Sequence, residues 1–438
     1  SIGNTKHRWF IGADIKYDKN FGDGKTFADS LPPYRSASFP NASFRKRKFS
    51  DIPGLSQLGL FAEENFSASI GEHNINILAG LRYDRYSKGK SALSPRVNIF
   101  VDAIPQVLTL RAGYGLLAKA PGIMYLSPEN AYFEYININE LASSSIPMEE
   151  RVFMTTTHNY STENPYLKIA KNEKKELGFD LSIGKTQLRV TAFDEKLKDG
   201  YAIGSTVNSF IPTQYTEYKR VKSSDPIYAI SASNPVLSNF SMPNNSYRQD
   251  KKGLELELDF PRIDAIRTQF SLYGAHKKQK IYSSDFFYYD DQSGVGGASR
   301  THVGLYQPAM TVDHDKSTVT TLKATHNIPS IGFVVTLTTE VIWNESDWKT
   351  YGNDSIPSHY ISKLDGQVYD FDVARKDEAE FKTLLRPLGR TEELVESFPP
   401  LINFNLNITK EIKDFLRISF FANNVFRSYP IAQSDRVS

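Results

Sequence analysis

The strongest constraint on the fold of this chain is a period-two alternation of apolar and polar residues in long segments. In one of them, Ile75, Ile77 and Ala79 alternate with Asn76 and Gly80. This alternation places the apolar side chains on one face of a β-strand and the polar side chains on the other. It predicts strands near 7–18, 57–69, 74–86, 93–103, 107–117, 173–183, 187–197, 251–260, 266–278, 317–328, 332–343, 400–409 and 416–426.

The predicted strands are nearly twice as long as the ~5–6 residues of an average strand in a soluble protein. They match instead the ~9–11 residues of a tilted strand that crosses a bilayer. No uncharged run approaches the ~18 apolar residues of a membrane helix, which excludes a helical membrane protein. The expected fold class is therefore all-β, as a transmembrane antiparallel β-barrel.

The connections between these strands alternate in length. Short links rich in Gly, Pro and Asp lie at 70–73, 104–106, 184–186, 261–265, 329–331 and 410–415. Long links lie at 19–56, 118–172, 198–250, 279–316 and 344–399, and the link at 87–92 is a short exception. Outer-membrane barrels have short periplasmic turns and long extracellular loops, so we expect the long links to be extracellular.

The composition of the 438 residues fits this interpretation. Lys and Arg number 52 against 50 Asp and Glu, and a net charge of +2 argues against a general nucleic-acid binder. The lack of Cys excludes disulfides, thiolate zinc sites and Cys nucleophiles. The mean hydropathy of -0.42 suggests a soluble protein. A barrel with a polar lumen explains the same value, because half of every strand is then hydrophilic.

Aromatic residues gather near the ends of the predicted strands, where interfacial girdles of membrane proteins lie. They are Trp9, Tyr17, Tyr83, Tyr86, Tyr114, Phe260, Trp343, Trp348, Phe415 and Phe426. Tyr and Phe are also good strand formers, which accounts for many of them singly but not for their concentration at strand ends.

One helix-like stretch, 371–389, interrupts the β pattern inside the longest expected loop. Its apolar residues can form one amphipathic face: Phe371, Val373, Phe381, Leu384, Leu385 and Leu388. Pro387 and Gly389 would end such a helix. We interpret the stretch as a packing element of the loop, with a substrate lid as the alternative.

Short motifs follow one another in a fixed order along the chain: Ser94–Pro95–Arg96, Arg111–Ala112–Gly113–Tyr114–Gly115, Ala120–Pro121–Gly122, Asn164–Pro165, the segment from Glu173 to Glu176, and Asn423–Asn424–Val425–Phe426. Each is weak alone, whereas their order and spacing are specific. With these motifs the chain resembles the C-terminal barrel portion of a TonB-dependent outer-membrane receptor, in particular the Bacteroidetes type.

The resemblance implies a 22-stranded barrel filled by an N-terminal plug domain. Residues 1–438 would then form about strands 9 to 21, and both chain ends look cut, so we expect a longer polypeptide. The expected partners are outer-membrane lipid and lipopolysaccharide, the rest of the receptor with its plug, and the TonB complex. TonB would grip a segment that precedes the plug and does not occur in this sequence. A surface lipoprotein over the loops is left open, and no nucleic acid is expected.

The chain shows no pattern typical of an enzyme, and no cofactor is expected. It contains no G-x-S-x-G, H-E-x-x-H or P-loop motif. The glycines at 113–115 and 294–297 are not followed by a helical pattern, so they predict a strand and a loop tip rather than a phosphate cradle. Asp313, His314 and Asp315 are interpreted as a solvated loop end rather than a metal site, and the eight His are scattered.

The better binding candidates are aromatic segments of the long loops. One cluster lies in 118–172 and the other, beside two carboxylates, in 279–316: Tyr125, Tyr132, Phe133, Tyr135, Phe286, Phe287, Tyr288, Tyr289, Asp290 and Asp291. Aromatic faces stack on sugars or apolar groups, and carboxylates orient polar atoms. Packing of loop against loop is the alternative. The basic run Phe44–Arg45–Lys46–Arg47–Lys48 either contacts lipopolysaccharide phosphates or is a solvated strand extension.

The sequence is compatible with two functions. The first is TonB-dependent active import of a bulky nutrient (a glycan, a peptide or a metal chelate), with this chain as barrel wall and outer capturing loops. The second is a passive porin or a barrel adhesin without energy coupling. A soluble all-β glycan-binding protein fits the hydropathy but not the strand lengths. Each of the first two places the protein in the bacterial outer membrane.

Overall fold

The computed structural model describes residues 5–25, 45–222, 225–289, 302–352, 355–387, 390–412, 415–428, 430–431, 434 and 436. Within these residues no helix is both long enough and apolar enough to cross a membrane. Short helical turns are present, among them α1 (Ile123–Leu126) and α2 (Ala379–Lys382).

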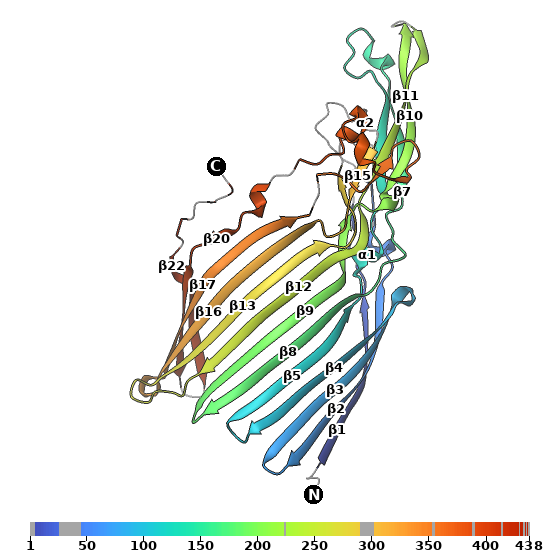
Figure 1. Cartoon of the computed structure of the whole chain (residues 1–438). Coiled ribbons are helices and arrows are strands. Elements are labelled where there is room, and N and C mark those ends of the chain that lie inside the picture. The colour runs from blue at the N-terminus through green and yellow to red at the C-terminus, as the bar shows by residue number, and fades with distance from the viewer. Residues whose placement is uncertain are drawn as a thin grey trace.

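Long antiparallel strands form one large sheet, and every predicted strand is confirmed. In spatial order they are β1 (Thr5–Asp18), β2 (Leu55–Ile70), β3 (His73–Tyr86), β4 (Ser91–Ile104), β5 (Leu108–Lys119), β8 (Ala170–Ile183), β9 (Thr186–Gly204), β12 (Met242–Asp259), β13 (Thr268–Ser283), β16 (Thr311–Ile328), β17 (Phe333–Tyr351), β21 (Leu401–Ile412) and β22 (Leu416–Ser428). The short strand β20 (Glu396–Phe398) pairs with β17. Figure 1 shows this sheet tilted and curved, as the wall of a barrel is.

Several strands extend well beyond their predicted ends, always toward the long connections. β9 continues to Gly204 and β17 to Tyr351, while β12 already begins at Met242. In these extensions both faces of a strand carry polar residues, as in 194–200, so the period-two signal disappears. The hydrogen-bond ladder continues because it depends on the backbone, as in the pairing of Lys171 with Lys198.

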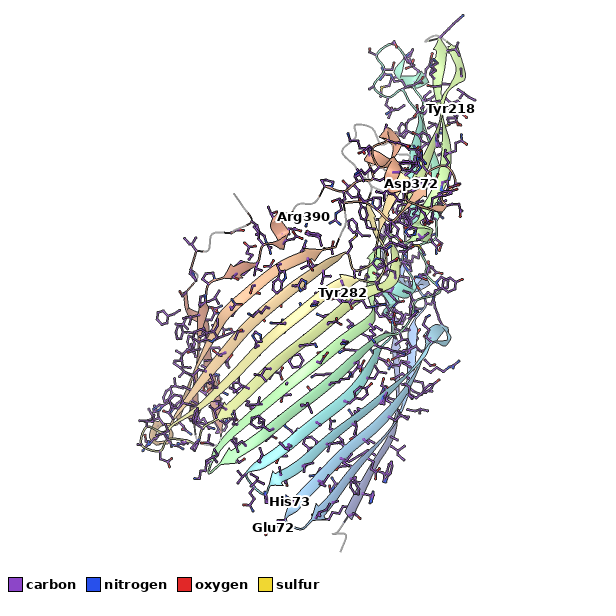
Figure 2. The ribbon with its side chains drawn as sticks, viewed as in Figure 1. Glu72, His73, Tyr218, Tyr282, Asp372 and Arg390 are labelled. Atoms are coloured by element: carbon purple, nitrogen blue, oxygen red, sulfur yellow. The ribbon has the colours of Figure 1, made fainter. Side chains whose placement is uncertain are left out.

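The short turns between strands use left-handed backbone conformations. The two-residue links 71–72 and 184–185 each begin with a glycine, Gly71 at φ 63° and Gly184 at φ 61°. Turns that match the twist of an antiparallel pair require such positive φ values, which glycine adopts without strain. Figure 2 labels Glu72 and His73 at this short-turn edge of the sheet.

The two faces of the large sheet differ in chemistry. We define the apolar face by outward residues such as Leu81, Leu177 and Leu254, which are large, apolar and exposed. The polar face carries ion pairs between strands. Arg82 of β3 reaches across β2 to Asp14 of β1 at 2.7 Å, and Arg189 of β9 pairs with Glu257 of the neighbouring β12 at 3.0 Å. A soluble sheet would cover its apolar face with other elements, whereas a membrane barrel turns it toward lipid.

The aromatic girdle is present with two corrections. Trp9, Tyr17 and Phe426 are exposed near strand ends, as predicted. Trp343 is exposed but lies in the middle of β17, because this strand continues to Tyr351. Tyr86 is not a girdle residue, because it is 7% exposed and packs with Ala92 and Ile169. Tyr86 has the same parity along β3 as Asp84, which is also buried, so its side chain lies on the polar face.

The long connections, which the sequence predicts as loops, fold into β-structure of their own. Two hairpins are formed by β6 (Ala131–Asn139) with β7 (Phe153–Tyr160), and by β10 (Phe210–Lys222) with β11 (Asp225–Asn239). A four-stranded sheet joins two connections through β14 (Phe287–Tyr289), β15 (His302–Tyr306), β18 (His359–Ser362) and β19 (Val368–Asp370). Figure 1 shows these elements stacked above the upper end of the large sheet.

The predicted helix over 371–389 is broken rather than continuous. A 3-10 turn covers Val373–Arg375, the backbone is extended at Glu378, and α2 follows. Phe371, Phe381 and Leu384 form a buried cluster, but Val373 is half exposed. The stretch packs against the four-stranded sheet through Tyr360, which agrees with its interpretation as a packing element. Leu388 and Gly389 lie outside the described residues.

Candidate functional site

The stacked outer elements form one packed body, which we call the rim. One hydrophobic cluster joins the β6–β7 hairpin to the start of β12 and consists of Ala131, Phe133, Phe240 and Met242, with Ile211 packed against it. A second cluster joins β10 to the four-stranded sheet and consists of Phe210, Val303, Leu305 and Ile361. Ile211 and Phe210 are neighbours on β10, so this hairpin ties the two clusters together. Connections that are far apart in the sequence therefore pack together as one scaffold.

A ladder of aromatic rings runs between the two hairpins. Tyr215 stacks on Tyr135 with ring centroids 4.9 Å apart. Tyr135 meets the edge of His158 at 5.8 Å, and His158 stacks on Tyr160 at 6.1 Å. Tyr160 in turn stacks on Phe240 at 5.5 Å. Such ring pairs are favourable beyond their buried area and hold the hairpins in register.

Hydroxyl groups complete the contact between the hairpins. The hydroxyls of Tyr135 and Ser238 are 2.8 Å apart, and those of Tyr160 and Thr213 are 2.5 Å apart. Burial raises the pKa of Tyr135 to about 12, so its phenol stays protonated and keeps a donor for this contact.

A buried ion pair fastens the far ends of the same hairpins. The Arg220 guanidinium donates from Nε to Glu140 Oε1 at 3.1 Å and from Nη2 to Glu140 Oε2 at 2.9 Å. Tyr228 and the Val152 backbone N–H also donate to Glu140, at 3.2 and 3.0 Å. The hydrogen bond from Arg220 lowers the pKa of Glu140 to about 2. We call this group the clamp.

The basic run of the first connection is docked on the second. Arg45 forms an ion pair with the buried Glu134. Arg47 donates to the backbone oxygens of Ser127 and Pro128, at 2.6 and 3.1 Å. The side chains of Lys46 and Lys48 are exposed, whereas Phe44 lies outside the described residues. Alternate residues of the run thus serve loop packing, which a simple solvated extension would not do.

The first predicted aromatic cluster is divided among several environments. Phe133 is 6% exposed in a hydrophobic cluster, and Tyr135 belongs to the ring ladder. Tyr132 lies under the Arg45 guanidinium, 5.2 Å from the ring centre, and Tyr125 contacts Tyr201 at 5.1 Å. Tyr132 and Tyr125 are half-buried and retain accessible surface.

The second predicted cluster lies on β14 and the residue before it. Phe286 meets His359 at 5.6 Å, Tyr288 meets Phe210 at 5.1 Å, and Tyr289 meets Tyr306 at 6.3 Å. Burial raises the pKa of Tyr288. Phe287 is 41% exposed and carries the Arg386 guanidinium 4.5 Å above its ring. Asp290 and Asp291 lie outside the described residues. The two clusters contact different hydrophobic clusters rather than one shared cavity.

Sequence reasoning missed the partners that make the rim. Tyr215 and Arg220 were not singled out, although the segment 211–221 is rich in the strand-forming residues Ile, Val, Thr and Tyr. Figure 2 labels Tyr218 high on the stacked hairpins. A cavity of about 550 Å³ between the first two long connections and the end of β9 was also missed.

The described residues contain no group of three or more His, Asp or Glu side chains arranged to hold a metal ion. Asp313–His314–Asp315 is part of β16 and not a loop end, which corrects the prediction. His314 stacks on Trp348 at 4.8 Å and contacts Thr350 Oγ1 at 2.9 Å, because the strand continues beyond the membrane band. Gly113 and Gly115 lie within β5 as predicted, and 294–297 fall outside the described residues.

Comparison with known proteins identifies the class of this barrel. The family model described as "TonB dependent receptor-like, beta-barrel" matches residues 2–425. The chain therefore belongs to the TonB-dependent receptor β-barrel family. A search of curated protein sequences finds no match.

Solved structures that are similar to this chain cover nearly all of its length. The outer membrane transporter YddB from Escherichia coli is 13% identical, with a TM-score of 0.50 over 97% of this chain and 48% of that one. The siderophore receptor PirA from Acinetobacter baumannii is 14% identical, with a TM-score of 0.47 over 96% and 48%. The ferric enterobactin receptor PfeA from Pseudomonas aeruginosa, solved with BCV-L6, is 14% identical, with a TM-score of 0.49 over 96% and 46%. The chain spans about half the length of these proteins.

Family membership indicates which environment each face of the large sheet contacts. The protein is located in the outer membrane, so the apolar face contacts lipid and the polar face lines the lumen. The ion pairs of the polar face, such as Arg111 with Asp180 at 2.9 Å, then neutralise charge within the wall. The rim stands at the end of the strands where the long connections lie.

Proposed function

We propose that this protein takes part in TonB-dependent active import of a bulky nutrient across the outer membrane. The chain supplies barrel wall and the rim that captures the nutrient. The observation that carries the proposal is a barrel of this receptor family whose long connections are folded into one packed rim. Binding loops on a rigid scaffold are a common arrangement for recognition.

We infer that residues 1–438 form about strands 9 to 21 of a Bacteroidetes-type receptor, with the rim extracellular. A plug domain in the same polypeptide closes the lumen, and TonB acts on a segment before the plug. The support is the order of the motifs quoted above and the share of the related structures that this chain covers. A reading frame of the whole gene without about 100–150 residues of plug, a usual domain size, would contradict this.

For ligand contact we propose the accessible aromatic faces of the rim. Tyr125, Tyr132 and Phe287 keep surface open to solvent, whereas Phe133 and Tyr288 pack against the hydrophobic clusters of the rim. Phe286, Tyr135, Tyr289 and the carboxylates Asp290 and Asp291 complete the set. We further propose that exposed Lys46 and Lys48 meet lipopolysaccharide phosphates, and that a surface lipoprotein can cover the rim.

Uptake by whole cells tests the proposed function. Cells that carry the full-length gene should accumulate the nutrient only when TonB is present, because movement of the plug requires energy. Purified full-length protein in a planar bilayer should form no open pore. Steady conductance together with uptake in cells that lack TonB would favour the passive porin instead.

A further inference from the structure

The cavity of about 550 Å³ beneath the rim has the features of a ligand site that is separate from the aromatic clusters. It lies where the first connection, the second connection and the ends of β9 and β12 meet, next to α1, which Figure 1 labels at the upper ends of the strands. Its volume falls within the ~300–1,000 Å³ that small-ligand pockets usually have.

The walls of this cavity are fixed by hydrogen bonds between segments distant in sequence. Lys25 and Arg47 pair through their backbones at 2.9 and 3.2 Å, and the Lys25 ammonium lies 2.7 Å from Glu129. Thr162 donates to the Glu129 backbone oxygen at 2.7 Å, and Asn164 donates to the Pro243 backbone oxygen at 2.9 Å. The cavity is therefore built into the fold rather than left by loose packing.

The lining is mainly aliphatic and partly open to solvent. Met124 on α1 is 60% exposed and Ile203 at the end of β9 is 52% exposed, although both lie outside the apolar band of the barrel. Ile52 and Ile123 add to the same wall. When an apolar ligand group covers exposed apolar side chains in a concave site, the free energy of the system is lowered.

Neutral polar groups converge on the same space. The Asn130 amide and the Ser241 hydroxyl line the cavity and make no hydrogen bond with any residue that the structure describes. Asn20 uses its side-chain oxygen for the Gly22 N–H at 2.9 Å, which leaves its amide nitrogen available. These groups supply both donors and acceptors for a ligand.

The charged residues of the lining cancel one another. Arg47 and Glu129 have opposite sign and lie 3.7 Å apart, and each is held by further partners in the wall. A charged ligand would have to displace these contacts, whereas an uncharged one would not.

We propose that this cavity binds an uncharged peptide segment with aliphatic side chains. Aliphatic walls suit leucine-like groups, and side-chain amides and hydroxyls suit peptide N–H and C=O groups. Phe49 is the one aromatic side chain of the described lining, which disfavours a sugar-stacking site. The inference rests on the proposed import function, for which it specifies the nutrient as a peptide.

The test uses purified full-length protein in detergent and a fluorescent tripeptide of leucine, serine and leucine, acetylated and amidated at its ends. Met124→Lys should weaken binding at least about tenfold, because it places an ammonium group in the aliphatic wall. Ser241→Ala removes one hydrogen-bonding group with little change in volume and should weaken binding by a factor of about 3–10. Met148→Lys is the matched control, since Met148 lies in the same connection, is 81% exposed and does not line the cavity.

Wild-type affinity in both cavity variants would overturn the inference, as would an equal loss in Met148→Lys. Binding of maltotriose in place of the peptide, with the same sensitivity to Met124→Lys, would also overturn it. Heat-modifiable migration in gels reports that each variant forms a folded barrel. Binding in detergent needs no TonB, so peptide binding without TonB-dependent uptake would contradict the proposed function alone. TonB-dependent uptake that is unchanged by the cavity variants would contradict this inference alone.

Discussion

At the scale of single residues, the polar face is shaped by glycines beneath long side chains. A Cβ added at Gly59 would fall on the Arg82 guanidinium and lie 2.7 Å from Asp14 Oδ1. The Arg82 side chain passes over Gly59, so that its Nη1 lies 2.7 Å from Asp14 Oδ1. Its Nη2 lies 2.7 Å from Asp84 Oδ1. The absence of a side chain on β2 thus allows an ion pair between β1 and β3.

Gly59→Ala should destabilise the barrel by roughly 0.5–3 kcal/mol, the usual range for a substitution that disrupts packed contacts. The loss should shrink in an Arg82→Met background, where nothing crosses the glycine. Thermal unfolding of purified protein in detergent measures both. If Gly59→Ala lowers the thermal stability equally in the two backgrounds, the close approach of Arg82 to Gly59 does not contribute to the effect.

His302 is a buried titratable residue of the rim. It is 8% exposed between Tyr360 and Phe381, with ring centroids at 4.6 and 5.3 Å, and its buried Nδ1 has no partner among the described residues. Burial lowers its pKa below the ordinary 6.5, against the opposing effect of Glu380 at 3.4 Å. Arg375 lowers the pKa further, and Asp365 raises it.

Because the folded pKa of His302 is lowered, the unfolded segment binds more protons as the pH falls. The stabilisation is therefore complete above about pH 6.5 and is lost as the pH falls through the folded pKa. The protection factors of 371–387, which are exchange rates corrected for the intrinsic pH dependence of amide exchange, should be lower at pH 5 than at pH 7.5. His302→Gln should abolish most of this difference, and an unchanged difference in that variant would assign it to another group.

At the scale of elements, the clamp decides whether the two hairpins move together. Arg220→Ala would leave the Glu140 carboxylate buried without its cation, which is more costly than removal of an exposed pair. We expect faster proteolysis within 131–160 and 210–239 while the barrel remains folded. Arg390→Ala is the control, because its ion pair with Glu393 is exposed. Equal protease resistance of the two variants would contradict the role of the clamp.

The pH dependence of the clamp follows from Glu140. Its pKa is lowered from 4.5 to about 2, so the stabilisation is complete above about pH 4.5 and is lost as the pH falls toward 2. The protease resistance of the hairpins should therefore be the same at pH 7 and pH 5. If protease resistance falls between pH 7 and pH 5, and falls equally in Arg220→Ala, a group other than Glu140 is responsible.

The elements also show what a sequence pattern can reveal. The thirteen long strands were predictable because alternation within 74–86 or 251–260 is set by a continuous lipid-facing surface. β10 and β11 were missed because both of their faces meet other parts of the rim, as Ile211 and Phe210 do. A strand covered on two sides has no alternating pattern to detect.

At the scale of the whole molecule, the apolar face must contact lipid. Leu177→Arg places a cation at the middle of β8 on this face, between Ala112 and Ala192. Such a change should cost about 2–4 kcal/mol near the bilayer midplane and lower the yield of assembled barrel. Thr321→Arg is the control, because its side chain shares the polar face with Glu340, its partner on β17. Equal assembly of the two variants would contradict the assignment of the faces.

The aromatic segment 286–289 should contribute to uptake by the complete receptor. Replacement of 286–289 by alanine should reduce uptake at least severalfold, because the exposed Phe287 ring is lost and Tyr288 and Tyr289 no longer pack on the rim. Phe287→Ala alone separates the two effects, since it removes the exposed ring and leaves Tyr288 in place. Unchanged uptake in a folded barrel that carries all four substitutions would exclude this cluster as a ligand contact.

The sequence by itself determined the strands, the two faces and the class of membrane protein. These follow from backbone geometry and from solvent on either side of one sheet, both of which act locally along the chain. Only the tertiary structure decided the rim, because its contacts join residues far apart. Glu140 and Arg220 are 80 positions apart, and Arg45 reaches Glu134 across 89. No local pattern specifies which charge will meet which, so the placement of these groups depends on the folded barrel beneath them.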